Sequence, residues 1–140
     1  MSQRIALVSC VKQKRSSAAP ARDLYVSELF RGLRRYAEAR ADAWHILSAE
    51  HGLLHPDQVV APYERTLNTM RKPERLAWAA RVQRQLVDVL PASAEVILLA
   101  GARYRENIEP FLRGRGYEVS VPLQRMALGK QLQYLKGIAR

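Results

Sequence analysis

The stretch Glu95–Ala100, with the sequence EVILLA, decides the fold class of this chain. It is a short apolar run, rich in branched side chains and stopped by Gly101, which is typical of a strand buried on both faces. Similar runs occur at three other places. They are Arg4–Cys10 (RIALVSC), Trp44–Ser48 (WHILS) and Tyr117–Leu123. The pattern predicts four buried strands.

Helical periodicity fills the intervals between these runs. Apolar residues recur at helical spacing in Val26–Ala37 and Pro73–Leu90, in a short segment around Ile108–Leu112, and from Leu128 to Ile138. Alternating strands and helices predict an α/β fold, with a mostly parallel central sheet covered on both faces. We therefore expect residues 1–140 to form a single three-layer α/β domain. The stretch His55–Lys72 is expected to be a long ordered connection.

Composition excludes several classes of protein. With 140 residues, of which 48% are hydrophobic and 26% charged, the chain has the size and make-up of one globular domain and is not a disordered or fibrous protein. The polar start predicts no signal peptide, and no apolar run approaches the ~20 residues of a membrane span. The single cysteine, Cys10, forms no internal disulfide, and the three histidines lack metal-ligand spacing. We expect a cytoplasmic protein without metal, cofactor or membrane contact.

The charge balance suggests an anionic partner. The chain carries a formal net charge of +10, and 18 of its 23 cationic residues are arginine. Arginine grips phosphate in two places, which favours a nucleic acid or a nucleotide as partner. Biased codon usage is the alternative explanation. The candidate phosphate contacts are Lys14, Arg15, Arg31, Arg34, Arg35, Arg81 and Arg84.

Small and polar residues follow the predicted strands. In open α/β sheets, ligands bind beyond the carboxyl ends of the strands. The residues there that are candidates for ligand binding are Ser9, Cys10, Lys12, Ser48, Gly52, Gly101, Arg103 and Tyr104, with Gln124 and Arg125 after the last strand.

Glu50 and His51 at the second strand end are candidates for general acid and base. Tyr63 and Glu64 lie in the long connection, where they could cover the site with an aromatic ring and a second carboxylate. The alternative is structural: Glu50 pairs with an arginine, His51 caps a carbonyl and Tyr63 anchors the loop. No GxxxxGK[ST], GxGxxG or GxSxG motif occurs, which disfavours P-loop NTPases, dinucleotide dehydrogenases and α/β-hydrolases.

One segment resembles a known family. Residues 46–56 (ILSAEHGLLHP) with 61–64 (APYE) are similar to the LSxxxGLLxP…PY signature of the YaaA-like proteins, bacterial peroxide-stress proteins that bind DNA, and of a smaller related domain family. The Ser9-Cys10…Lys12 start, Leu24-Tyr25 and Leu99-Ala100 with Tyr104 agree. The resemblance implies DNA binding in a damage or stress response, and a pocket lined by Ser48, Gly52, Pro62, Tyr63 and Tyr104. The helix-hairpin-helix of YaaA proteins has no counterpart here.

Two alternatives remain open. A weaker similarity to deazaguanine-processing enzymes and nucleoside glycosidases suggests hydrolysis of the N-glycosidic bond of a modified or damaged base. Glu50 or Glu64 would then stabilise the cation-like transition state, His51 or Lys12 would protonate the leaving nitrogen, and Tyr63 or Tyr104 would stack on the base. The other alternative is a small-ligand sensor that uses the same pocket without turnover.

Overall fold

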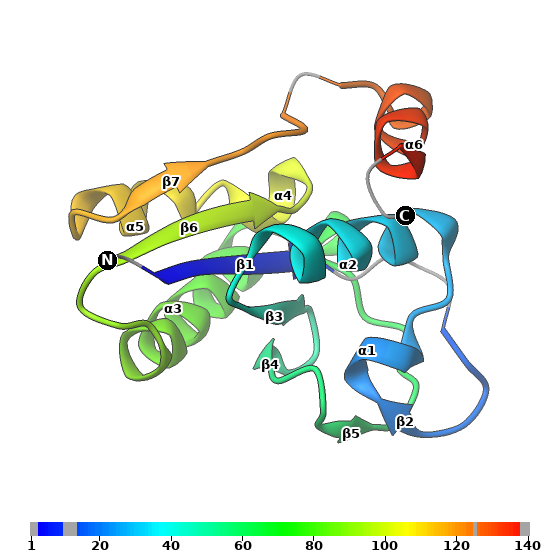
Figure 1. Ribbon diagram of the computed structural model, residues 1–140. Helices are drawn as coiled ribbons and strands as arrows, with labels where there is room; N and C mark the ends of the chain where they lie inside the picture. The colour runs from blue at the N-terminus through cyan, green and yellow to red at the C-terminus, as the bar shows by residue number, and fades with distance from the viewer. Residues whose placement is uncertain (1–2, 10–13, 125, 138–140) are drawn as a thin grey trace.

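The fold is built on a five-stranded sheet of order β4-β3-β1-β6-β7 (Figure 1). The computed structural model describes residues 3–9, 14–124 and 126–137. The strands are β1 (Gln3–Ser9), β3 (Ala43–Ser48), β4 (Gly52–Leu54), β6 (Ala94–Leu99) and β7 (Glu118–Ser120). All neighbouring strands are parallel except β4, which runs antiparallel to β3. The expected α/β domain with a mostly parallel sheet is thus confirmed.

Six helices and one 3-10 turn are formed by the described residues. Four of the helices connect the strands or pack on the sheet. These are α2 (Glu28–Arg40), α3 (Lys72–Val89), α5 (Glu109–Gly114) and α6 (Leu128–Lys136). Two are single turns, α1 (Ala21–Leu24) and α4 (Ala102–Arg105), and the 3-10 turn η1 is Leu67–Thr69. No helix in the described part of the chain is long and apolar enough to cross a membrane.

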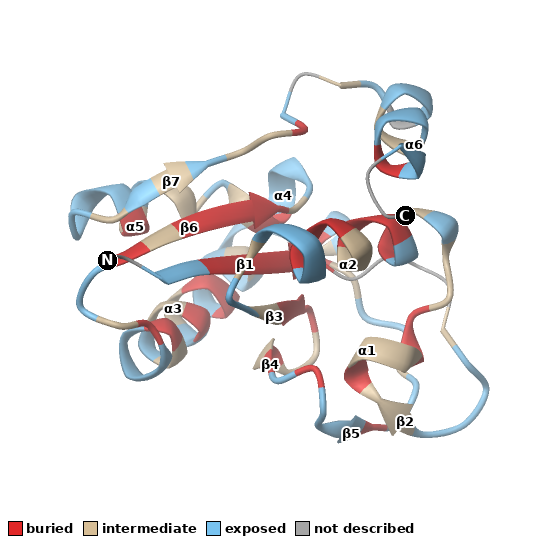
Figure 2. Cartoon of the chain, in the orientation of Figure 1, coloured by how far each residue is buried: buried red, intermediate tan, exposed pale blue. Residues whose placement is uncertain are grey.

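β1 is the centre of the sheet. Its residues Ile5–Ser9 pair with Ala43–Leu47 of β3 on one side, and Gln3–Val8 pair with Ala94–Leu99 of β6 on the other. All five residues from Ile5 to Ser9 are buried, because helices cover both faces of the strand (Figure 2). A strand buried on both faces needs the continuous apolar sequence seen here rather than an alternating one.

The connections place the helices in two layers. The chain passes from β1 to β3 in one direction across the sheet, then from β3 past β1 to β6 and on to β7 in the other. Because parallel crossovers are right-handed, α2 must cover one face and α3 and α5 the opposite one. α6 packs on α2 and completes the first layer (Figure 1).

Several short elements were not predicted from the sequence. β4 escapes detection because three residues after a tight turn carry no strand periodicity, so the central sheet has five strands rather than the expected four. The predicted fourth strand, 117–123, pairs only over Glu118–Ser120, and the predicted short helix divides into α4 and α5. The long connection 55–72 contains β5 (Val59–Val60), which pairs with β2 (Ala19–Pro20), and η1.

The turn into β4 depends on Gly52. Its φ is +74°, a conformation that side-chain-bearing residues rarely adopt. A Cβ at this position would also lie 2.4 Å from Oε1 of Gln85, the atom that accepts a hydrogen bond from the Leu53 N–H. The turn and its contact with α3 therefore require glycine.

We expect Gly52→Ala to lower the free energy of unfolding by about 1–3 kcal/mol, because it combines a strained φ with displacement of the Gln85 amide. Urea denaturation followed by circular dichroism measures this change. Gly114→Ala is the control, since a Cβ at Gly114 meets no atom within 4 Å. Equal stability of the two variants would contradict the expected strain.

Candidate functional site

A hollow of about 340 Å³ lies at the carboxyl ends of β1 and β6. The chain leaves these two neighbouring strands in opposite directions, β1 toward β3 and β6 toward β7. Such a switch point is where open α/β sheets bind their ligands. We call this cavity the switch-point hollow. The residues that line it are Ser9, Leu29, Leu33, Asn68, 98–102, Tyr104, Arg105, Val121, Leu123, Gln124 and Gln131.

The floor of the hollow is fixed by the sheet. The Ser9 hydroxyl oxygen accepts a hydrogen bond from the Gly101 N–H at 3.4 Å, which joins the ends of β1 and β6. Leu29 and Leu33 of α2 form part of an apolar wall, and Gln131 brings α6 to the rim. The hollow is therefore assembled from residues distant in sequence but adjacent at one edge of the sheet.

Charge is almost absent from the lining. No Asp or Glu is among the described lining residues, and Arg105 is their one charged side chain. Its Nη1 donates to the Ala100 carbonyl at 2.9 Å, and its Nε lies 3.9 Å from Oε1 of Glu109. Arg105 is thus partly neutralised and held against the protein.

α4 is anchored by α3. Arg75 of α3 donates from Nε to Oε1 of Glu106 at 2.7 Å and from Nη1 to the Met70 carbonyl at 2.8 Å. The hydrogen bond from Arg75 keeps the pKa of Glu106 below its usual value. This ion pair ties the segment after Gly101 to α3 and so fixes one side of the hollow.

A chain of hydroxyl groups lies at the neighbouring strand end, beside β3. The Tyr63 hydroxyl lies 2.7 Å from Oγ of Ser48 and 2.6 Å from the Tyr25 hydroxyl. Ser48 is fully buried, and its Oγ also accepts the His51 N–H at 3.1 Å. Nζ of Lys14 lies 4.6 Å from the centre of the Tyr63 ring, a cation–π contact. We call Tyr25, Ser48 and Tyr63 the hydroxyl cluster.

Trp78 and Tyr104 connect this cluster to the hollow. The Trp78 indole N–H donates to the Ser48 carbonyl at 2.8 Å, and its ring meets the Tyr104 ring edge-on with centroids 5.7 Å apart. Tyr104, whose ring lines the hollow, also accepts the Leu67 N–H at 3.4 Å. The two features are therefore neighbours joined by packed aromatic rings.

A sequence profile described as "Family of unknown function (DUF6884)" matches residues 5–137, from within β1 to the end of α6. The chain belongs to this DUF6884 family. It is also 32% identical, over 142 residues, to the "Uncharacterized protein YfjM" of Bacillus subtilis (strain 168); the match covers 95% of this chain and 93% of that protein. Neither description names a ligand, a partner or a reaction.

The strand-end residues divide between two places in this family member. Ser9, Gly101 and Tyr104 line the switch-point hollow, together with Gln124. The Ser48 and Tyr63 side chains belong to the hydroxyl cluster and do not line the hollow. Gly52 faces α3, where it meets Gln85 and Arg81. Ser9, Gly101 and Tyr104 thus line the hollow, whereas Ser48, Gly52 and Tyr63 lie at the neighbouring end of β3.

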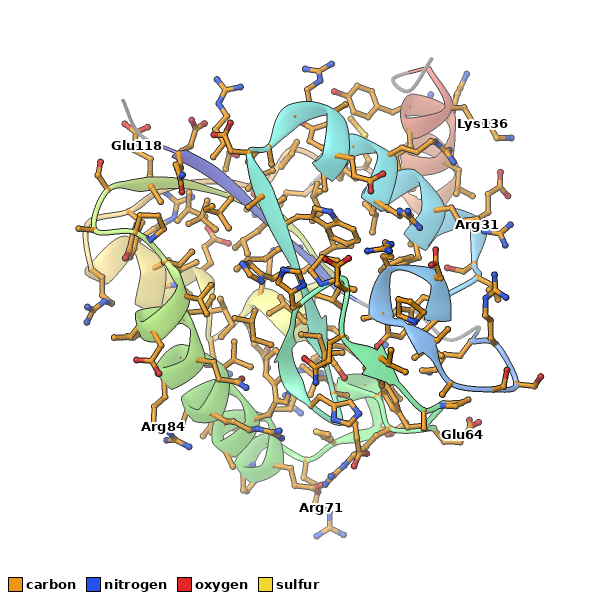
Figure 3. All side chains as sticks on the ribbon, turned by 60° about the horizontal axis from the view of Figure 1, so that its bottom comes forward. Arg31, Glu64, Arg71, Arg84, Glu118 and Lys136 are labelled. Atoms are coloured by element: carbon orange, nitrogen blue, oxygen red, sulfur yellow. The ribbon has the colours of Figure 1, made fainter. Side chains whose placement is uncertain are left out.

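The candidate acid–base residues do not face the hollow. The Glu50 carbonyl accepts a hydrogen bond from Nη1 of Arg81 at 3.0 Å, and the His51 ring packs edge-on against Tyr63 with centroids 5.5 Å apart. Glu64 is exposed and points outward at the periphery of the molecule (Figure 3). Arg103 is exposed, with its Nη1 3.5 Å from Oε2 of Glu106. Cys10 and Lys12 lie outside the described residues.

The candidate phosphate contacts lie on opposite faces of the sheet. Arg31 and Arg35 are on α2, whereas Arg81 and Arg84 are on α3, and Arg31 and Arg84 lie far apart at the molecular surface (Figure 3). These arginines therefore form two separate groups, one on α2 and one on α3.

Two other basic residues are held by internal partners. Arg34 donates from Nη1 to Oδ1 of Asp23 at 3.0 Å and from Nε to Oε2 of Glu38 at 3.2 Å. Burial lowers the pKa of Arg34, but these two carboxylates raise it more, so the net shift is upward. Arg15 donates from Nε to the Asp23 carbonyl at 2.8 Å. Both side chains already serve the packing of α1 and α2.

Three residues that line the hollow were not predicted from the sequence. Asn68 comes from η1 in the long connection, Arg105 from α4, and Gln131 from the polar side of α6. None directly follows a predicted strand. Only the position of Gln124, just beyond the predicted fourth strand, offered a clue.

A histidine pair lies away from the hollow, beside β3. The His45 and His55 rings are edge-on with centroids 6.0 Å apart, in a second hollow that they share with Arg22, Arg34, Glu38 and Asp57. Burial lowers the pKa of His45, and the nearby His55 lowers it further. The described residues include no group of three or more His, Cys, Asp or Glu placed to hold a metal ion.

Loss of the Tyr63 hydroxyl should loosen the long connection. We expect Tyr63→Phe to lower the free energy of unfolding by about 1–2 kcal/mol, because the buried Ser48 Oγ and the Tyr25 hydroxyl each lose a partner. Urea denaturation measures the change. Tyr134→Phe is the control: it removes the hydroxyl of a 40% exposed ring that packs on Tyr36, so it should cost less stability than Tyr63→Phe. A Tyr63→Phe protein as stable as the wild type would show that the cluster contributes packing alone.

The His45 pKa predicts a pH-dependent stability. Because folding lowers this pKa, the unfolded chain takes up a proton first as the pH falls below about 6.5. The contribution of His45 is complete above that pH and is lost as the pH falls through the lower folded-state value. Urea denaturation between about pH 7.5 and 5 should show a smaller loss of stability for His45→Gln than for the wild type. If the free energy of unfolding of the two proteins depended on pH in the same way, His45 would be excluded as the titrating group.

Proposed function

We propose that this protein binds a nucleotide, free or within a nucleic-acid strand, in the switch-point hollow. The observation that carries the proposal is the position of the hollow, at the carboxyl ends of β1 and β6 where the strand order reverses. The net charge of +10 adds long-range attraction for a polyanion. The resemblance to YaaA-like proteins extends the proposal to DNA and to a damage or stress response.

The size and lining of the hollow favour a single nucleotide unit. Its volume of about 340 Å³ is at the small end of ligand cavities, which range over about 300–1,000 Å³. The apolar wall of Leu29, Leu33 and Leu123 suits a base, whereas Ser9 and Gln124 offer hydrogen bonds. With no carboxylate among the described lining residues, the hollow does not repel phosphate.

The face formed by α2 and α6 is the better approach for a longer strand. α2 supplies two lining residues of the hollow and also carries Arg31 and Arg35, which have no carboxylate partner among the described residues. α6 adds Lys136 at this face, with its Nζ 3.2 Å from Oε1 of Glu28 on α2. Phosphates that flank a bound nucleotide would meet this face first, and α3 would lie behind the sheet.

The N-glycosidase alternative gains no support from this arrangement. That reaction needs a carboxylate beside the bound sugar, and neither Glu50 nor Glu64 lines the hollow. A small-ligand sensor without turnover would use the same hollow as the proposed nucleotide site. The binding measurements described next therefore test this alternative as well.

Fluorescence anisotropy with short labelled single- and double-stranded DNA tests the proposal. We expect binding that weakens at least about tenfold between about 50 and 200 mM salt, since released counterions drive phosphate binding. Gly101→Leu should reduce affinity about tenfold or more at either salt concentration by filling the hollow, because its φ is ordinary and a Cβ there meets no atom within 4 Å. Gly114→Leu, equally open but on α5, is the matched control.

A second pair of variants separates the two faces. The slope of the logarithm of the binding constant against the logarithm of the salt concentration measures the number of phosphate contacts. The double variant Arg31→Ala/Arg35→Ala should reduce the size of this slope by about one for each arginine that pairs with a phosphate, and Arg81→Ala/Arg84→Ala should leave it unchanged. Absence of binding to any oligonucleotide or mononucleotide at low salt would overturn the proposal. If binding were unchanged in Gly101→Leu, the binding site would lie elsewhere than in the hollow.

A further inference from the structure

We propose that the base taken by the switch-point hollow is adenine, recognised by side-chain amides. This inference rests on the nucleotide-binding function proposed above and names the class of base. It starts from the polar side chains of the hollow, three of which are carboxamides: Asn68 from η1, Gln124 from the segment after β7, and Gln131 from α6.

The amides are available to a ligand. Gln131 donates from Nε2 to the Met126 carbonyl at 2.8 Å, which fixes the amide plane and leaves its Oε1 to accept a hydrogen bond. Asn68 and Gln124 are exposed at the rim, and their amides make no hydrogen bond with the described residues. A carboxamide carries a donor and an acceptor side by side, which matches the adjacent N6 donor and N7 acceptor of adenine.

The contacts that most often read guanine and cytosine use groups that the described lining residues do not offer freely. Guanine presents two adjacent acceptors, O6 and N7, and is bound in bidentate fashion by Arg or Lys. The one cation among the described lining residues, Arg105, is already committed to the Ala100 carbonyl and to Glu109. Cytosine presents an N4 donor that Asp or Glu accepts, and neither is among those lining residues.

The apolar wall supports the same ligand. Leu29 and Leu33 of α2 and Leu123 after β7 offer a surface for the face of a planar base, and the amides surround its edge. Because Arg105 is partly neutralised and held against the Ala100 carbonyl, the hollow itself gains little from phosphate. Most of the affinity for a mononucleotide should therefore come from the base, with phosphate groups outside the hollow.

Isothermal titration calorimetry with adenosine, guanosine, cytidine and uridine tests the choice of base. We expect adenosine to bind about tenfold or more tightly than the other three, the discrimination typical of a bidentate amide contact. AMP should bind within about threefold of adenosine at moderate salt, since screened phosphate adds little there. Gln124→Leu should bring the four nucleosides to within a few-fold of one another, whereas Gln133→Leu, an exposed glutamine of α6 that does not line the hollow, should preserve the preference.

The adenine could come from a free nucleotide or from a base turned out of a DNA strand. A duplex with one unpaired adenine, compared with the fully paired duplex and with the same duplex carrying an unpaired guanine, distinguishes the sources. Preference for the unpaired adenine over both duplexes would assign a strand as the source, because unstacking is cheapest there. Preference for AMP alone would assign the free nucleotide, and either result supports the inference.

Three results overturn it. Equal binding of adenosine and guanosine, or binding of phosphorylated ligands only, would remove the adenine inference and leave nucleotide binding intact. An adenosine preference that survives Gln124→Leu, Asn68→Leu and Gln131→Leu together would show that the amides do not read the base. Absence of binding to nucleosides, nucleotides and oligonucleotides alike would overturn the proposed function itself.

Discussion

The structure depends on the parallel pairing of β1 with both of its neighbours. Because β1 lies between β3 and β6, its carboxyl end brings Ser9 beside the end of β3 and within 3.4 Å of the Gly101 N–H, 92 residues along the chain. No local interaction could create this juxtaposition. The helices then follow from handedness: α2 covers one face, and α3 and α5 cover the other. The switch-point hollow is the space that remains where these opposite connections diverge.

Most of the fold could be predicted from the sequence, because strands buried on both faces leave an unmistakable apolar run. The segments RIALVSC, WHILS and EVILLA correspond to β1, β3 and β6, and helical spacing located α2, α3 and α6. Short elements could not be predicted in this way. β4 depends on a positive φ at Gly52 and on contacts with α3, which arise only after the chain has folded.

The candidate site was predictable only in part, and for a related reason. The rule that ligands bind at strand ends located Ser9, Gly101 and Tyr104, which depend on topology. It could not distinguish which polar residues beyond a strand face the cavity and which face a helix. Ser48 and Gly52, which pair with each other across the turn into β4, illustrate the difference, since one bonds to Tyr63 and the other meets Gln85. Asn68 and Gln131 reach the hollow from elements whose placement depends on tertiary packing.

The hydroxyl cluster and the hollow share supports without sharing a lining. Trp78 donates to the Ser48 carbonyl and packs on Tyr104, so the two strand ends are held by one rigid aromatic layer. A ligand in the hollow would therefore bind to a surface already fixed by the core. Little reorganisation would accompany binding at that side, and the exposed amides at the rim would contribute most of the adjustment.

The position of β1 in the sheet also has a kinetic consequence. Its first neighbour, β3, follows after β2, α1 and α2, but its second, β6, follows only after the long connection and α3 as well. Until that distant partner docks, one edge of this buried strand has no partner, and pairing between segments so far apart in sequence slows folding. The same open edge is a template for pairing between chains, so partly folded molecules would aggregate through β1. Docking of β6 both ends this exposure and creates the hollow, which links protection from aggregation to the completion of the binding site.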